Sequence, residues 1–138
     1  MIRWYKIAAY LLIGLGVLHE LIEAMPKPNE PEMQSMIQTM KNFDIDFLET
    51  ISAWDYMLGY SFMMGFLFIV WGVNLLVNSN NEEVMRKSLY INTFGVLIAF
   101  LLSLRFFHYL AYGWIAIVGI ILVTLSIKQL RGIFENDQ

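Results

Sequence analysis

Residues 54–77 read WDYMLGYSFMMGFLFIVWGVNLLV, and no charged side chain occurs from Met57 to Val77. A helix of about 20 apolar residues crosses the ~30 Å hydrocarbon core of a lipid bilayer. A chain of 138 residues has too small an interior to bury such a run away from water. The stretch therefore predicts a transmembrane helix over residues 53–77.

Two patterns mark the start and the packing face of this helix. Ser52 and Asp55 have the spacing of an N-terminal capping pair, so we expect the helix to begin next to Ser52. The small residues Ser61, Gly65 and Gly72 recur along the run at intervals of four and seven residues. Small residues let the backbones of neighbouring membrane helices approach closely. We therefore expect this helix at the centre of a bundle, with Gly65 at a helix–helix contact.

The composition of the whole chain agrees with membrane insertion. Hydrophobic residues make up 58 % of it and charged residues 15 %, against about 25 % charged residues in a typical soluble domain. The net charge of −3 provides no basic face, so we expect no nucleic-acid partner. The lack of cysteine excludes disulfides and thiolate metal sites. We expect one integral membrane domain, residues 1–138, in contact with the lipid bilayer.

Three further apolar runs have the length of membrane spans, and the predicted fold is an all-α, four-helix transmembrane bundle. The alternative for the first run is a cleaved secretory signal. Residues 22–24 (Ile-Glu-Ala) are a poor cleavage site, so we expect a retained first span that ends before Pro26. The predicted spans are about 4–24, 53–77, 88–105 and 109–127.

The connection after the first span contains a predicted amphipathic helix over residues 31–42, with Pro31 in its first turn. Thioethers can bind Cu(I), but methionines on a lipid-facing helix usually form only its apolar face. Residues 43–47 alternate apolar and acidic side chains, which indicates a brief extended segment, and five residues are too few to predict a sheet. The apolar face of the amphipathic helix consists of Met33, Met36, Ile37 and Met40.

The Lys and Arg residues predict the orientation, because positive residues concentrate in cytoplasmic loops. With the N-terminus inside, six of these residues fall on the inner side and three on the outer side. We therefore expect a multi-pass protein of the cell inner (cytoplasmic) membrane with both termini in the cytoplasm. The inner residues are Arg3, Lys6, Arg86, Lys87, Lys128 and Arg131, and the outer ones are Lys27, Lys41 and Arg105.

Two polar patterns lie near the inner ends of the second and third spans. Asn80 and Glu83 have capping-box spacing and predict the start of the third helix. Asn74 and Asn92 fall at a similar depth. We expect an interhelical hydrogen bond there, and a polar transport path is the alternative.

On this topology, ionisable residues of three spans gather at the outer end of the bundle. His19 and Glu23 are four residues apart and share a helix face. With a second histidine from another helix, His108, they would form a workable first shell for zinc, copper or iron. A small polar pocket is therefore predicted. Its candidate ligand-binding residues are His19, Glu20, Glu23, Trp54, Asp55, Arg105 and His108.

A structural interpretation explains the same residues. Charged groups at helix ends extend to the membrane surface, where water solvates them. Asp55 stabilises a helix N-terminus, and Arg105 would pair with Glu20 or Glu23. The run His-Glu-Leu-Ile-Glu at residues 19–23 lacks the second histidine of a zinc protease motif. No nucleophile with a neighbouring base is evident, so no catalytic residue and no cofactor is assigned.

Several motifs resemble those of a family of small bacterial four-span membrane proteins, and the overall plan is similar to that of DoxX-like proteins. The motifs are Gly-Val-Leu-His at 16–19, Ser-Ala-Trp-Asp-Tyr-Met-Leu-Gly at 52–59, and Arg-Phe-Phe-His at 105–108. The resemblance implies the architecture and no reaction. His108 replaces a proline that follows the aromatic pair in such relatives, so the resemblance does not support a family site at His108.

Two classes of function fit these observations. The first is a non-enzymatic integral membrane protein that binds a small ligand at the outer pocket or acts as an accessory subunit. Its partner would then be another membrane protein, or further copies of the same chain in a homo-oligomer. The second is a membrane-embedded enzyme or metal-handling protein that uses His19, Glu23 and His108. A bound metal would favour the second class, and a co-purifying chain would favour the accessory role.

Overall fold

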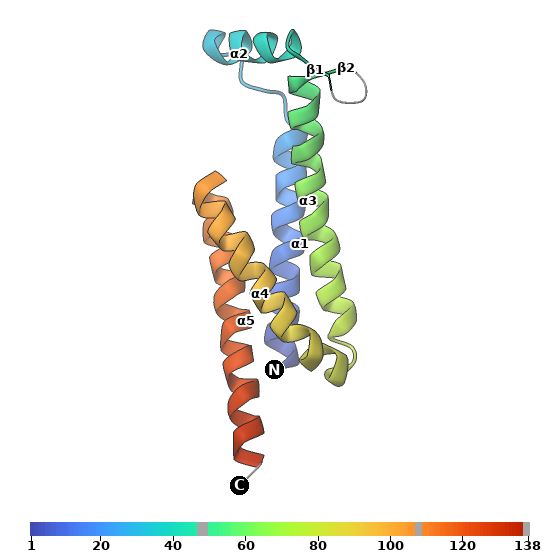
Figure 1. Cartoon of the computed structure of the whole chain (residues 1–138), viewed down its shortest axis with the longest axis vertical. Coiled ribbons are helices and arrows are strands. Elements are labelled where there is room, and N and C mark those ends of the chain that lie inside the picture. The colour runs from blue at the N-terminus through green and yellow to red at the C-terminus, as the bar shows by residue number, and fades with distance from the viewer. Residues whose placement is uncertain (47–49, 107–108, 137–138) are drawn as a thin grey trace. The chain divides into compact units, whose positions relative to one another are not determined.

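The computed structural model describes residues 1–46, 50–106 and 109–136 (Figure 1). Four of its helices are long and apolar enough to cross a membrane, which confirms the predicted all-α fold of a multi-pass membrane protein. In chain order the elements are α1 (Ile2–Ala24), α2 (Pro31–Lys41), β1 (Asp44–Asp46), β2 (Thr50–Ser52), α3 (Ala53–Asn78), α4 (Glu82–Phe106) and α5 (Tyr109–Asn136).

The chain forms two compact units. The larger unit comprises Met1–Leu15 and Phe68–Gln138, and the smaller unit comprises Gly16–Leu67. The helices α1 and α3 each contribute one part to each unit.

The larger unit is a bundle of segments from all four long helices. Helices α4 and α5 lie side by side in opposite directions (Figure 1). Large apolar side chains such as Ile91 and Phe94 stay exposed on the outside, as expected for a surface that faces hydrocarbon. The buried core is formed by Tyr5, Ala8, Ala9, Leu12 and Leu15 of α1, Leu75 of α3, Met85, Leu89 and Val96 of α4, and Ile115, Val118, Leu122 and Leu125 of α5.

A network of uncharged polar groups joins three helices of the larger unit around Asn92. The indole nitrogen Nε1 of Trp71 donates to Asn92 Oδ1 at 2.7 Å. Asn92 Nδ2 donates to the Tyr5 hydroxyl at 3.2 Å and to the Ser88 carbonyl at 2.9 Å. Gly95, one turn along α4, leaves room for the Trp71 ring, since a methyl group there would lie 3.1 Å from Cζ2. The network gives every polar side-chain atom of Asn92 a partner.

This arrangement corrects one predicted partner. Asn92 does form interhelical hydrogen bonds, as expected, but not with Asn74. The Asn74 side chain is exposed and accepts from Asn78 Nδ2 on its own helix at 3.0 Å. The prediction was wrong because similar depth does not ensure that two residues face each other.

Two backbones of the larger unit approach each other closely at Gly72. A methyl group on Gly72 would lie 2.6 Å from the Ala9 carbonyl oxygen and 2.9 Å from the Ile13 backbone nitrogen. Main-chain atoms cannot rotate away as side chains can, so only glycine fits here. The small-residue pattern therefore does mark a helix–helix contact, but the backbone contact is at Gly72.

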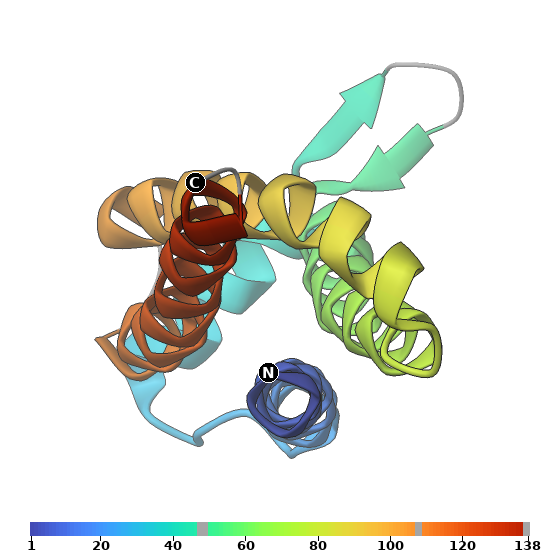
Figure 2. The same cartoon turned by 90° about the horizontal axis from the view of Figure 1, so that it is seen from below.

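The smaller unit combines the end of α1, the short helix α2, a hairpin and the start of α3. Pro31 occupies the first turn of α2, as predicted, and Ile37 is the buried residue of its apolar face. Strands β1 and β2 pair antiparallel, with Asp44 opposite Ser52. Figure 2 shows this hairpin next to the start of α3. The predicted extended segment is confirmed at residues 44–46, and residues 50–52 supply a partner strand that the sequence analysis did not predict.

The helix starts follow local capping. Asp55 N donates to Ser52 Oγ at 3.1 Å, and Ser52 Oγ donates to Asp55 Oδ2 at 2.7 Å, which confirms the predicted cap of α3. At α4 the cap is Asn81, whose Oδ1 accepts from Glu83 N and Val84 N. Asn80 is therefore not the capping residue. Two salt bridges, Arg86 to Glu82 and Lys87 to Glu83, support the polar first turns that precede the apolar run of α4.

Candidate functional site: His19 and Glu20 against α3

The site lies in the smaller unit, where the C-terminal part of α1 packs on α3. His19 Nε2 is 3.0 Å from the carbonyl oxygen of Ser61 and 3.0 Å from its hydroxyl. A carbonyl oxygen can only accept, so Nε2 carries the hydrogen in this arrangement. Nδ1 is then the ring nitrogen that could accept a further hydrogen bond when the imidazole is neutral.

Glu20 follows His19 on α1, and its side chain lies against the same surface of α3, at Gly65. A methyl group built at Gly65 would lie 2.9 Å from Glu20 Cδ and 3.0 Å from His19 Cδ2. Gly65 is itself buried. Ser61 and Gly65 are one turn apart on α3, so these two small residues leave space for the side chains of His19 and Glu20 from α1. The expected helix–helix contact at Gly65 is thus made by the side chains of His19 and Glu20.

The Glu20 carboxyl group is the polar group in the smaller unit that needs an explanation. Its Oε1 atom is buried and has no hydrogen-bond partner among the described residues. A buried carboxylate without a donor or a positive charge is strongly disfavoured in hydrocarbon. A bound partner that supplies a donor or a positive charge would satisfy this oxygen atom.

The site lies within the helices and not at their ends. His19 precedes the last residue of α1, Ala24, by five residues, which is about 7.5 Å along the axis. Ser61 follows the first residue of α3, Ala53, by eight residues, or about 12 Å. The site is therefore set back from the two helix ends, where charged groups reach water most easily.

Two other predicted site residues lie closer to the start of α3. Asp55 is six residues before Ser61, or about 9 Å along the helix axis, and its carboxylate is engaged by Ser52. Trp54 is buried at 8 % exposure. The structure thus brings His19 and Glu20 together with Ser61, while Trp54 and Asp55 belong to the helix start.

Glu23 belongs to the end of α1. Its Oε2 lies 3.2 Å from Lys27 Nζ, and the same ammonium donates to the Glu23 carbonyl at 3.3 Å. The lysine thereby satisfies a carbonyl of the last helical turn and balances the carboxylate. Glu23 is therefore paired with Lys27 at the C-terminal end of α1, one turn from His19.

The remaining predicted site residues lie elsewhere. Arg105 is exposed near the end of α4 in the larger unit, and its pairing with Glu20 or Glu23 stays a prediction. His108 falls outside the described residues, so the proposed metal set with His19 and Glu23 also stays a prediction. Among the described residues, no group of three or more His, Asp or Glu side chains is placed to hold a metal ion.

Ser61 is the site residue that the sequence analysis did not assign. The sequence did mark this position, because Ser61 precedes Gly65 by four residues in the pattern of small side chains. That spacing predicted backbone packing, whereas in the structure a histidine and a glutamate fill the space.

In comparisons with known proteins, the chain matches no family model, no curated protein and no solved structure.

Proposed function

We propose that this protein is a non-enzymatic integral membrane protein that binds a small, donor-rich ligand at the site formed by His19, Glu20 and Ser61. The observation that supports the proposal is the buried Glu20 Oε1 atom, which has no hydrogen-bond partner among the described residues. The resemblance to small bacterial four-span membrane proteins agrees with this role, since it implies no reaction.

The chemistry of the site favours a ligand with N–H donors and a positive charge. Glu20 offers a carboxylate oxygen, and a neutral His19 with its hydrogen on Nε2 offers Nδ1 as an acceptor. A positive charge would offset the penalty of a buried carboxylate. A primary ammonium group carries three donors in a small volume and fits these acceptors. We therefore propose an amine or another small cation as the ligand class.

The test uses methylammonium as the probe and the purified full-length protein in mild detergent. Native mass spectrometry and thermal unfolding are measured for wild type, Glu20→Gln and Glu23→Gln. We expect methylammonium to stabilise wild type, by about 2.7 kcal/mol at one hundred times its Kd. Glu20→Gln should lose this stabilisation, because the neutral amide removes the negative charge from the site.

Glu23→Gln is the matched control, since it removes the same charge one turn away on the same helix. It should keep the response to methylammonium. Equal responses in all three proteins, or none in wild type, would contradict the proposed ligand class. Native spectra would also reveal a bound metal, which favours the metal-handling alternative, or a stoichiometric second chain, which favours an accessory role.

We also propose that the protein lies in the cell inner membrane with both termini in the cytoplasm, because the Lys and Arg residues are distributed as the positive-inside rule requires. Reporter fusions test this orientation. A fusion at Asn29 should give an outside signal, and a fusion at Asn80 an inside signal. The reverse pattern, or a mature chain that starts after Ala24, would show that the topology is wrong.

A further inference from the structure

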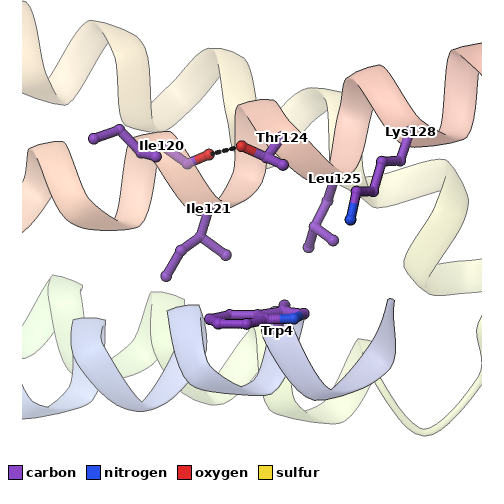
Figure 3. Close-up of a pocket in the computed structure, with 6 residues that line it drawn as sticks. All are labelled: Trp4, Ile120, Ile121, Thr124, Leu125 and Lys128. Carbon is purple, nitrogen blue, oxygen red and sulfur yellow. Dashed lines mark hydrogen bonds between the residues drawn. The ribbon is translucent and has the colours of Figure 1, made fainter.

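A cavity lies in the larger unit, between the first turns of α1 and the second half of α5 (Figure 3). Its volume is about 290 Å³, near the lower end of the range for small-molecule sites, about 300–1,000 Å³. It is separate from the site at His19 and Glu20 in the smaller unit. The lining residues are Trp4, Ile120, Ile121, Thr124, Leu125 and Lys128.

Most of the cavity wall is apolar. The indole of Trp4 faces Ile121 and Leu125 across the gap (Figure 3), and Leu125 is buried in the core. Thr124 Oγ1 donates to the Ile120 carbonyl at 2.7 Å, so its proton is used within the helix. Ile120 is 66 % exposed, which joins the rim of the cavity to the apolar outer surface. The cavity is therefore open toward the apolar outer surface of the larger unit.

The charge at the cavity is positive. Lys128 is the one ionisable residue of the lining, and its amino group turns toward the cavity (Figure 3). Arg3 precedes Trp4 in the sequence, and Arg131 follows Lys128 by about one helical turn. A lysine at the end of an apolar wall, beside a tryptophan, is the arrangement expected where a helix meets the headgroup layer.

From this combination we infer that the cavity is a binding site for one anionic phospholipid. The phosphate lies at Lys128 Nζ, and the first part of one acyl chain lies between Trp4 and Leu125. Basic pockets between membrane helices recognise acidic headgroups in this way. A zwitterionic lipid would bring its own ammonium group toward Lys128, so the site discriminates by net headgroup charge. A free phosphate lacks the chain that fills the apolar wall.

The test measures lipid retention by native mass spectrometry of the full-length protein in mild detergent. Phosphatidylglycerol and phosphatidylcholine with identical chains are added separately. Wild type should retain one phosphatidylglycerol about fivefold more strongly than phosphatidylcholine, which is the effect expected of one cation near a lipid surface. Lys128→Gln should abolish the preference without reducing phosphatidylcholine retention. Lys87→Gln removes the same charge from a side chain that is 75 % exposed and does not line the cavity, and it should retain the preference.

A second pair of variants tests the apolar part of the site. Thr124→Trp fills the cavity and should reduce retention of both lipids, whereas Ile91→Trp adds an equal indole at a position that is 75 % exposed on α4 and should reduce neither. The inference is overturned if Lys128→Gln and Lys87→Gln retain phosphatidylglycerol equally. It is also overturned if Thr124→Trp leaves lipid retention unchanged, or changes only the oligomeric state.

Discussion

Gly72→Ala is expected to destabilise the protein by about 3 kcal/mol, the upper end of the usual range for overpacking. The added methyl group would meet the Ala9 carbonyl oxygen and the Ile13 backbone nitrogen at distances below 3 Å. Neither group can move without displacing α1, because both belong to its main chain. The substitution therefore forces α1 and α3 apart where they touch. The dispersion contacts between the two helices are then lost.

Thermal unfolding in detergent micelles, followed by far-ultraviolet circular dichroism, measures this effect. Gly59→Ala is the control on the same helix, because a methyl group there meets nothing within 4 Å. It should be neutral or stabilising by up to about 1 kcal/mol, through the higher helix propensity of alanine. If the two alanine variants unfolded at the same temperature, the close backbone contact at Gly72 would be refuted.

Asn92→Leu is expected to destabilise the larger unit by about 2 kcal/mol. Leucine is similar in size but leaves the partly buried indole N–H of Trp71 without an acceptor and removes a donor to Tyr5. Interhelical hydrogen bonds in membrane proteins usually contribute about 0.6 kcal/mol and at most about 1.7. We expect a value above the average because one substitution breaks two interhelical bonds.

Asn74→Leu is the matched control for Asn92→Leu. Asn74 is exposed and bonds only to Asn78 of its own helix among the described residues, so its loss should change stability by less than about 0.5 kcal/mol. Tryptophan fluorescence provides an independent readout, because the indole of Trp71, one of four tryptophans in the chain, exchanges a hydrogen-bonded environment for an apolar one only in Asn92→Leu. Equal unfolding temperatures for the two variants would mean that the network contributes nothing.

The sequence predicted features that depend on length or on neighbours along the chain. Charge-free runs of sufficient length predicted four long helices, since a bilayer sets that length. The capping pair of Ser52 and Asp55 was predicted because both partners lie within one turn. The cap of α4 was misplaced by one residue, since residues 78, 80 and 81 are all asparagine and each is a competent cap.

Features that depend on a partner helix were only partly predictable. Gly65 and Gly72 lie on one helix within two turns, yet one faces side chains of α1 and the other faces its backbone. The spacing of small residues shows where space exists, but the residues of the opposite helix determine what fills it. For the same reason Glu20 was predicted as a site residue, whereas its contact with Gly65 was not.

The network around Asn92 has a consequence for the response of the protein to acidity. Its members are an amide, an indole, a serine hydroxyl and a phenol, and none of these changes charge near neutral pH. Acidification of either compartment therefore leaves these hydrogen bonds intact.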